Sequence, residues 1–152
     1  MNILLTNDDG INSSGLWAIA EKLVNIGSVT VAVPDRNQSG TGASMTLTEP
    51  VKMEKVTPAV TGVVDAYAIE GTPADCVIMG AEHICKGEID LVVSGINEGA
   101  NLGLDILNSG TFGAALHGYF RGINSIAVSA KYLGEVIYGP AATIGASVSQ
   151  SL

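Results

Sequence analysis

Short apolar runs rich in β-branched residues alternate with helical patterns along this chain, and the alternation restricts the fold more than any other feature. The predicted strands span residues 2–6, 28–34, 51–56, 63–71, 90–95 and 124–130. The predicted helices span residues 13–27, 72–85 and 111–122, with one more beginning near Pro140. Strands that alternate with helices pair in parallel through right-handed crossovers. The sequence therefore predicts an α/β fold, with a doubly wound, mostly parallel sheet sandwiched by helices and an added β-hairpin.

Two helices are predicted from particular residues. The helix 13–27 has an apolar stripe that is expected to face the core and consists of Leu16, Ile19, Ala20, Leu23 and Val24. The helix 72–85 has a typical start, with Thr72 as N-cap, Pro73 in the first turn and Asp75 three residues after the cap. The glycine-rich stretch 97–110 is expected to form a long loop.

Length and charge limit the class of protein. The 152 residues suffice for one domain with a sizeable core, so a single domain over residues 1–152 is expected. With 15 acidic and 7 basic residues, the net charge of −8 repels a phosphate-rich polymer, and nucleic acid is not expected as a partner. The first residues lack the regions of a signal peptide, and the apolar runs are too short to span a membrane. We therefore expect a cytoplasmic protein without a membrane partner.

Two cysteines, Cys76 and Cys85, lie in one apolar segment without the CxxC spacing of redox or zinc motifs. A metal or redox pair is one interpretation. The other is a pair of buried thiols in a reducing compartment, and the spacing favours this second interpretation.

Three polar loops follow predicted strands. They read TNDDG over residues 6–10, PDRNQSG over residues 34–40 and SGINEGANLG over residues 94–103. In an open α/β sheet, ligands bind in the crevice outside the carboxyl ends of the strands. We therefore expect the three loops to converge there and form one site.

The residue types in these loops fit a hard divalent cation. Asp8 and Asp9 supply negative charge, while Ser39 and Asn97 supply neutral oxygen atoms, and Mg²⁺ or Mn²⁺ prefers such ligands. Glycines in and beside the loops let backbone amides approach phosphate oxygens, and they are Gly40, Gly42, Gly99, Gly103 and Gly110. The helix start at residues 109–115 is also suited to an anion. Each motif alone has a simpler interpretation, because DDG is typical of a turn and SGTG of a flexible loop.

Three blocks of this sequence resemble the signature blocks of the SurE family, the stationary-phase survival proteins. They are ILLTNDDGINSSGL, VAVPDRNQSGTGASMTLT and VVSGINEGANLGLDILNSGTFGAA, and together they span residues 3 to 115. The resemblance implies a Rossmann-like α/β sandwich with an added β-hairpin, which forms dimers or tetramers. It also implies a metal-dependent 5′-nucleotidase that hydrolyses nucleoside monophosphates.

The resemblance assigns roles to individual residues. The implied metal ligands are Asp8, Asp9, Ser39 and Asn97, the same four that the loops indicate. The implied positions near the phosphate are Gly40, Asn101, Ser109, Gly110 and Thr111.

This chain also departs from the family pattern. The family usually has tyrosine, valine and glutamate where this chain has Asn108, Phe112 and His117. We expect Asn108 and His117 to affect the substrate pocket or an interface, while no implied metal ligand is lost. Family members are substantially longer, which implies that residues 1–152 are a short domain or one truncated at its C-terminus.

Three functions compete at this point. The first is a phosphomonoesterase in which Asp8 and Asp9 take part in catalysis, with one divalent metal ion and a nucleoside monophosphate as substrate. The second is a module on the same fold that binds a nucleotide or phosphate without catalysis. The third, a dinucleotide-binding oxidoreductase, is disfavoured because the first loop lacks GxGxxG and its acidic pair repels a pyrophosphate.

Overall fold

The computed structural model describes residues 1–86, 88–132 and 134–152. The strands are β1 (Asn2–Thr6), β2 (Ser28–Pro34), β3 (Met53–Val56), β4 (Val63–Ile69), β5 (Leu91–Glu98) and β6 (Asn124–Ala130). The helices are α1 (Ser14–Leu23), α2 (Pro73–Met79), α3 (Asp105–Asn108), α4 (Gly110–Phe120) and α5 (Tyr138–Gln150). A π-helical turn, η1 (Gly80–Ile84), continues α2.

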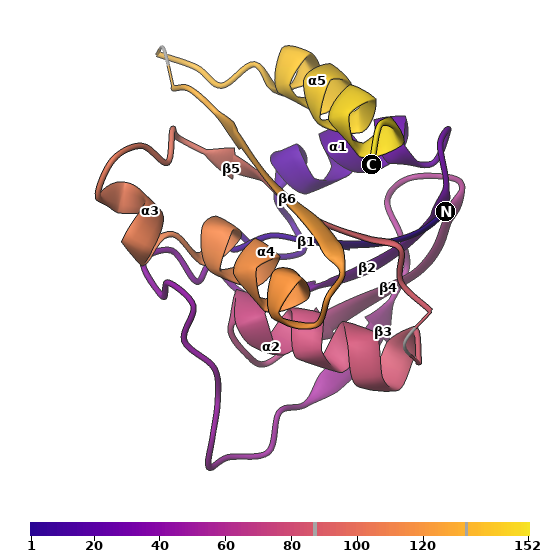
Figure 1. Ribbon diagram of the computed structural model, residues 1–152, viewed down its shortest axis with the longest axis vertical. Coiled ribbons are helices and arrows are strands. Elements are labelled where there is room, and N and C mark those ends of the chain that lie inside the picture. Colours follow the sequence, from indigo (N-terminus) through magenta and orange to yellow (C-terminus); the bar gives the residue numbers. More distant parts are fainter. Residues whose placement is uncertain (87, 133) are drawn as a thin grey trace.

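The strands form one six-stranded sheet between two layers of helices (Figure 1). The strand order is β3-β4-β2-β1-β5-β6, and every neighbouring pair is parallel except β3 and β4. Helices α1 and α5 pack together on one face, and α2 and α4 pack together on the other. The predicted α/β fold, a doubly wound and mostly parallel sheet covered by helices, is confirmed.

The order of the strands places a switch point beside the central strand. The chain moves from β1 to β2 on one side and later returns to β5 on the other side of β1. The connections that leave β1 and β5 consequently lead to helices on opposite faces, α1 and α4. A crevice opens between such diverging connections, at the carboxyl ends of the strands.

The core explains why β1 is apolar without alternation. A strand in the middle of a parallel sheet is covered on both faces, so side chains of both orientations are buried. Ile3 and Leu5 pack with Leu16 of α1 on one face, whereas Leu4 packs with Val77 of α2 on the other. All five side chains are at most 2% exposed.

The predicted hairpin is formed by β3 and β4 and is part of the sheet. The strand β3 pairs with β4 in antiparallel register, from Met53 opposite Ile69 to Val56 opposite Ala66. The strand β4 itself pairs in parallel with β2. The hairpin therefore lies within the sheet, with β3 at its edge.

Two predicted elements end three or more residues away from the predicted position. The first helix ends at Leu23 rather than at residue 27, because the amides of Ile26 and Gly27 turn back to the Leu23 carbonyl. The strand predicted at residues 90–95 continues to Glu98.

The longer strand changes the glycine-rich stretch that follows it. After a register shift, Asn97 and Glu98 pair with Ser129 and Ala130 of β6, so the predicted loop 97–110 begins inside a strand. The same stretch also contains the short helix α3.

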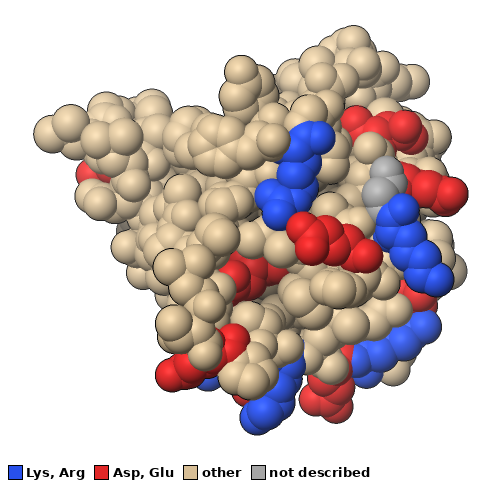
Figure 2. Space-filling model, turned by 60° about the horizontal axis from the view of Figure 1, so that its bottom comes forward, with Lys and Arg blue, Asp and Glu red and all other residues tan. Residues whose placement is uncertain are grey.

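The surface mixes charges of both signs. Figure 2 shows acidic and basic side chains interspersed on one face. Exposed ion pairs join Lys52 to Glu70 and Arg121 to Glu82, with nitrogen–oxygen distances of 3.2 and 3.3 Å.

Of the helices in the described ranges, none combines the length and apolar character needed to cross a membrane.

The capping box at the start of α2 is confirmed and has a second role. The Thr72 amide donates to Asp75 Oδ2 at 2.9 Å, and the Asp75 amide donates to Thr72 Oγ1 at 3.1 Å. Thr46, in the loop between β2 and β3, donates its amide to Asp75 Oδ1 at 2.9 Å and its hydroxyl to Oδ2 at 2.7 Å. Burial raises the pKa of Asp75, but the hydrogen bonds from Thr72 and Thr46 outweigh it and lower the pKa below its ordinary value of 3.8. Asp75 thus fastens the loop to α2.

Asp75→Asn is expected to lower the free energy of unfolding at pH 7 by about 1–2 kcal/mol, because one of the two accepting oxygens is lost. The folded pKa lies below the unfolded one, so the carboxylate stabilises the fold above the unfolded pKa. This contribution is lost as the pH falls through the folded pKa. Urea titrations between pH 7 and pH 3 should show the difference between wild type and variant shrinking.

The matched control is Glu70→Gln, which breaks an exposed ion pair and should change stability by less than about 0.5 kcal/mol. A difference between wild type and Asp75→Asn that stays constant from pH 7 to pH 3 contradicts this account.

Candidate metal and phosphate site

A polar cleft of about 300 Å³ opens at the carboxyl ends of β1, β2 and β5. Six of the sequence-predicted site residues line it, namely Asp8, Ser39, Gly40, Asn97, Asn101 and Ser109. These residues come from the loops after β1 and β2, from the end of β5 and the segment that follows it, and from the N-cap of α4. Asp9, Gly110 and Thr111 are not among the lining residues, and each is described below.

Asp8 is buried at the base of the cleft and is 3% exposed. Its Oδ1 accepts a hydrogen bond of 2.6 Å from Thr111 Oγ1. A Cβ atom at Gly110 would lie 2.8 Å from Asp8 Cβ and 3.0 Å from Oδ2, so only glycine fits there without displacing the aspartate. Gly110 and Thr111 therefore act on Asp8, and Oδ2 is left as the oxygen available to a ligand.

Asp9 is half-buried and incompletely paired. Its Oδ1 accepts a hydrogen bond of 3.2 Å from Asn37 Nδ2, and its buried Oδ2 has no hydrogen-bond partner in the described part of the chain. Burial and then the Asp8 carboxylate raise the pKa of Asp9, against a lowering by the backbone amide of Glu98. A buried carboxylate oxygen without a partner is costly, and a cation beside it removes that cost.

Asn37 connects the first two loops, and it was not among the residues predicted from the sequence. In addition to its bond to Asp9, its Oδ1 accepts a hydrogen bond of 3.0 Å from the Ser39 amide. The next residue, Gln38, donates its amide to the Asp8 carbonyl at 2.7 Å. The available signal was the position of Asn37 within the same polar loop as Ser39, but an amide that bonds to another loop leaves no pattern in the sequence.

Two asparagines, one at the end of β5 and one in the segment that follows it, have defined orientations. Asn97 Nδ2 donates to the Gly99 carbonyl at 2.9 Å, which leaves Oδ1 as its free oxygen. Asn101 Nδ2 donates to Ser129 Oγ at 2.9 Å, which leaves one N–H and the carbonyl oxygen. Asn97 is thus arranged as an oxygen ligand, and Asn101 keeps a donor for an anion.

The start of α4 lies at the edge of the cleft. Ser109 is its N-cap, and Ser109 Oγ accepts a hydrogen bond of 3.2 Å from the Phe112 amide. The hydroxyl proton of Ser109 remains available to donate. The exposed amides of a helix N-terminus favour a negative group, which suits both the Asp8 carboxylate and a phosphate.

Negative charge is concentrated around the cleft. Glu98 and Asp105 line it together with Asp8, and neither was predicted as a site residue from the sequence. The described lining residues include no lysine or arginine, so a phosphate ester would be repelled here unless a cation accompanied it.

Within residues 1–86, 88–132 and 134–152, no three His, Cys, Asp or Glu side chains are grouped to hold a metal. A cation bound in the cleft must therefore also use hydroxyl and amide oxygens, which Ser39 and Asn97 offer. Such a set of ligands suits a hard divalent cation.

The departures from the family pattern occupy different places. Asn108 lines the cleft. His117 is buried outside the cleft lining, and its Nε2 lies 3.0 Å from the Ala43 carbonyl oxygen.

The two cysteines form no disulfide bond. Cys76 is buried and Cys85 is half-buried, and burial raises the pKa of both thiols. These facts fit the interpretation of the cysteines as buried thiols.

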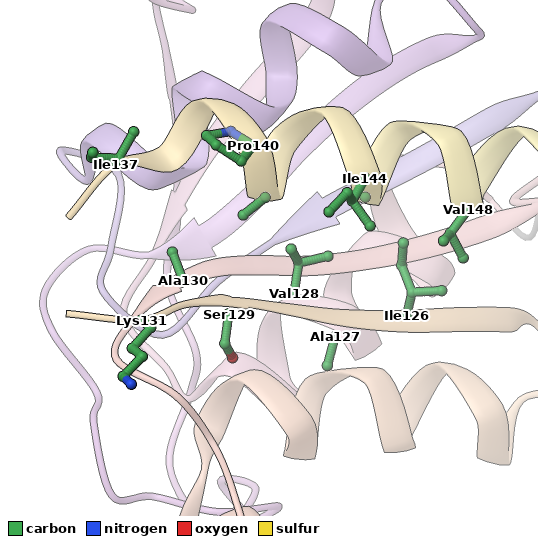
Figure 3. Close-up of a pocket in the computed structure, with 12 residues that line it drawn as sticks. Ile126, Ala127, Val128, Ser129, Ala130, Lys131, Ile137, Pro140, Ile144 and Val148 are labelled. Carbon is green, nitrogen blue, oxygen red and sulfur yellow. The ribbon is translucent and has the colours of Figure 1, made fainter. Parts of the chain in front are cut away.

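A larger groove of about 610 Å³ lies elsewhere, between β6 and α5. Figure 3 shows Ile126 and Val128 of the strand facing Ile144 and Val148 of the helix across it. The described residues that line it include no carboxylate. Of these two hollows, only the smaller cleft has carboxylates among its described lining residues.

Fold and cleft together define a class: a Rossmann-like protein with carboxylate, hydroxyl and amide oxygens gathered at its switch point. Residues 3–152 match the family described as Survival protein SurE, and the chain belongs to the SurE family.

The chain is similar to proteins named 5′-nucleotidase SurE. One from Dehalococcoides mccartyi (strain ATCC BAA-2266 / KCTC 15142 / 195) is 53% identical over 135 residues, which cover 89% of this chain and 51% of the relative. One from Methanopyrus kandleri is 53% identical over 129 residues, which cover 85% of this chain and 48% of the relative. The chain thus spans about half the length of the curated relatives it matches.

A solved structure agrees with the fold. The crystal structure of the SurE protein from Aquifex aeolicus superposes with a TM-score of 0.89 at 44% sequence identity. The match covers 99% of this chain and 59% of that chain.

Gly110→Ala is expected to lower the free energy of unfolding by about 1–3 kcal/mol, because the new methyl group overlaps Asp8 and forces the strand end and α4 apart. The matched control is Gly139→Ala in α5, where an added Cβ meets nothing within 4 Å. That control should leave stability unchanged or raise it by up to about 1 kcal/mol. Equal effects of the two substitutions in urea unfolding contradict the close packing of Gly110 on Asp8.

Proposed function

We propose that this chain is a metal-dependent 5′-nucleotidase that hydrolyses nucleoside 5′-monophosphates to nucleoside and phosphate. The observation that supports it most is the convergence on one cleft of Asp8 and Ser39 from two loops and Asn97 from the end of β5. The neighbouring Asp9 has a buried Oδ2 without a hydrogen-bond partner among the described residues. The names of the similar proteins, 5′-nucleotidase SurE, support the same activity.

The residues present fit a divalent cation, with Mg²⁺ or Mn²⁺ as our proposal. Asp8 Oδ2 and Asp9 Oδ2 would supply the negative ligands, and Ser39 Oγ and Asn97 Oδ1 the neutral ones. When bound, such an ion polarises a phosphoryl oxygen and neutralises the charge that develops as the ester bond breaks.

The remaining residues would bind and orient the phosphate. Gly40 allows its loop backbone to approach the phosphate, because its φ is +82° and a Cβ atom there would meet nothing within 4 Å. The free N–H of Asn101 and the Ser109 hydroxyl are donors at the edge of the cleft. The hydrogen bond from Thr111 fixes the orientation of the Asp8 carboxylate.

An aspartate of the pair is proposed as the base that accepts a proton from the attacking water. Direct attack by Asp8 on phosphorus is less favoured, because Asp8 is only 3% exposed and Thr111 occupies its Oδ1.

The assignment has further parts that stand as proposals. Residues 1–152 are proposed to form a single SurE-like domain, and the family resemblance supports a homodimer or tetramer. The two free thiols, Cys76 and Cys85, support a reducing compartment such as the cytoplasm.

Asp8→Asn is expected to reduce phosphate release from a nucleoside 5′-monophosphate with Mg²⁺ or Mn²⁺ by at least about 100-fold, since a negative ligand and candidate base is lost. The matched control is Asp65→Asn on β4, where the carboxylate pairs with Lys55 instead of lining the cleft. Control activity should stay within about twofold of wild type. Wild-type turnover by Asp8→Asn contradicts the assignment, and nucleotide binding without turnover by the wild type favours the non-catalytic binding module.

Removal of divalent metal by chelation and dialysis is expected to abolish phosphate release, and added Mg²⁺ or Mn²⁺ should restore it. The reason is the negative lining of the cleft, which repels the phosphate when no cation is present. A colorimetric phosphate assay before and after metal addition measures this. Undiminished activity of the fully chelated protein would count against the proposal.

A further inference from the structure

One helix, α4, contacts both Asp8 and the loop that carries Ser39. In its first turn, Thr111 donates a hydrogen bond to Asp8, and Gly110 packs closely against Asp8 because it has no side chain. Residues three, four and seven positions apart lie on one face of a helix. Gly113 and His117 therefore share a face with Gly110 and lie one and two turns further along α4.

That same face contacts the loop that carries Ser39. A Cβ atom at Gly113 would lie only 2.1 Å from the Gly42 carbonyl oxygen, so α4 and the loop backbone touch directly. One turn later, His117 Nε2 lies 3.0 Å from the Ala43 carbonyl oxygen. A carbonyl oxygen only accepts, so Nε2 carries the proton and donates.

The segment around Ser39 is short and is tied at both ends. Before Ser39, the Gln38 amide donates to the Asp8 carbonyl at 2.7 Å. After it, the Gly42 amide donates to the Asn108 carbonyl at 3.0 Å, and Ala43 accepts from His117. Ser39 itself is exposed, so these anchors set its position rather than packing of its own side chain.

His117 is only 8% exposed, with its ring edge-on to Phe120 at 5.8 Å between centroids. Its backbone carbonyl accepts a hydrogen bond of 3.2 Å from Arg121 Nη1. The imidazole is therefore held in place, and its bond to Ala43 is a partly buried contact across 74 residues of sequence. The glutamate that the family usually has here carries no proton to donate at neutral pH, so the contact depends on this chain's own residue.

We propose that His117 is a positioning residue for the candidate metal site: by donating to the Ala43 carbonyl, it holds Ser39 in place relative to Asp8. The inference rests on the proposed function for the role of Ser39 as a ligand. The loop contact itself is independent of that function. His117 touches neither the metal position nor the substrate and acts only through the loop.

The test compares His117→Leu, which removes the donor, with His117→Gln, whose amide nitrogen can replace Nε2. Binding of Mn²⁺ alone is measured by calorimetry, and exchange of the backbone amides in residues 38–44 is measured by mass spectrometry. Loss of a residue that orients a ligand typically costs 10–100-fold in metal affinity. We expect His117→Leu to bind Mn²⁺ at least about tenfold more weakly and to exchange faster in residues 38–44 alone. His117→Gln should stay within about threefold of wild type.

Wild-type Mn²⁺ affinity in His117→Leu overturns the inference, and so does a His117→Gln variant as weak as His117→Leu. If His117→Leu does not fold, His117→Asn takes its place, because its amide is too short to reach Ala43 and it should show the same loss.

Asp8→Asn separates the two proposals. Weak binding by Asp8→Asn together with wild-type binding by His117→Leu overturns the positioning role and leaves the proposed function intact. Absence of Mn²⁺ binding by the wild type overturns the proposed metal site and, with it, the role of His117 there.

Discussion

Two adjacent carboxyl groups, those of Asp8 and Asp9, stand at the end of the central strand β1, one buried and the other half-buried. Charges so close together in a partly desolvated place repel each other, and the raised pKa of Asp9 reflects that burial and the Asp8 charge. Hydrogen bonds from Thr111 and Asn37 compensate in part. One buried oxygen, Asp9 Oδ2, still lacks a partner among the described residues, and we propose that a divalent cation fills that place.

The fold makes this arrangement possible. Because β1 and β5 are neighbours with helices on opposite faces, their carboxyl ends open into a crevice instead of being covered. The loop after β2 completes the cleft from the other side, held by Asp75 of α2 and by α4. The two contacts differ in kind, since Asp75 also caps α2, whereas the His117 imidazole contacts the loop at Ala43 and packs against Phe120. Stability and site geometry thus depend on partly separate contacts.

Local patterns predicted much of this structure. Periodicity located the strands and helices, the Thr72–Asp75 capping box was readable from spacing, and parallel topology predicted that Ser39 and Asn97 would meet near Asp8. Contacts between distant segments were not predictable. The bond from Asn37 to Asp9 spans 28 residues and that from His117 to Ala43 spans 74, and no local pattern specifies such pairs. The extension of β5 likewise depends on its pairing with β6. The early end of α1, in contrast, comes from a local turn back to Leu23.

The central claim is that Asp8, Asp9, Ser39 and Asn97 bind one divalent cation. Crystals of the protein grown with Mn²⁺ test it most directly, with diffraction data collected above the manganese absorption edge. The account predicts a single strong anomalous peak in the polar cleft, within about 2.0–2.4 Å of oxygen atoms from these four residues. A cleft without anomalous density at saturating Mn²⁺, or a peak coordinated by other residues, would contradict it.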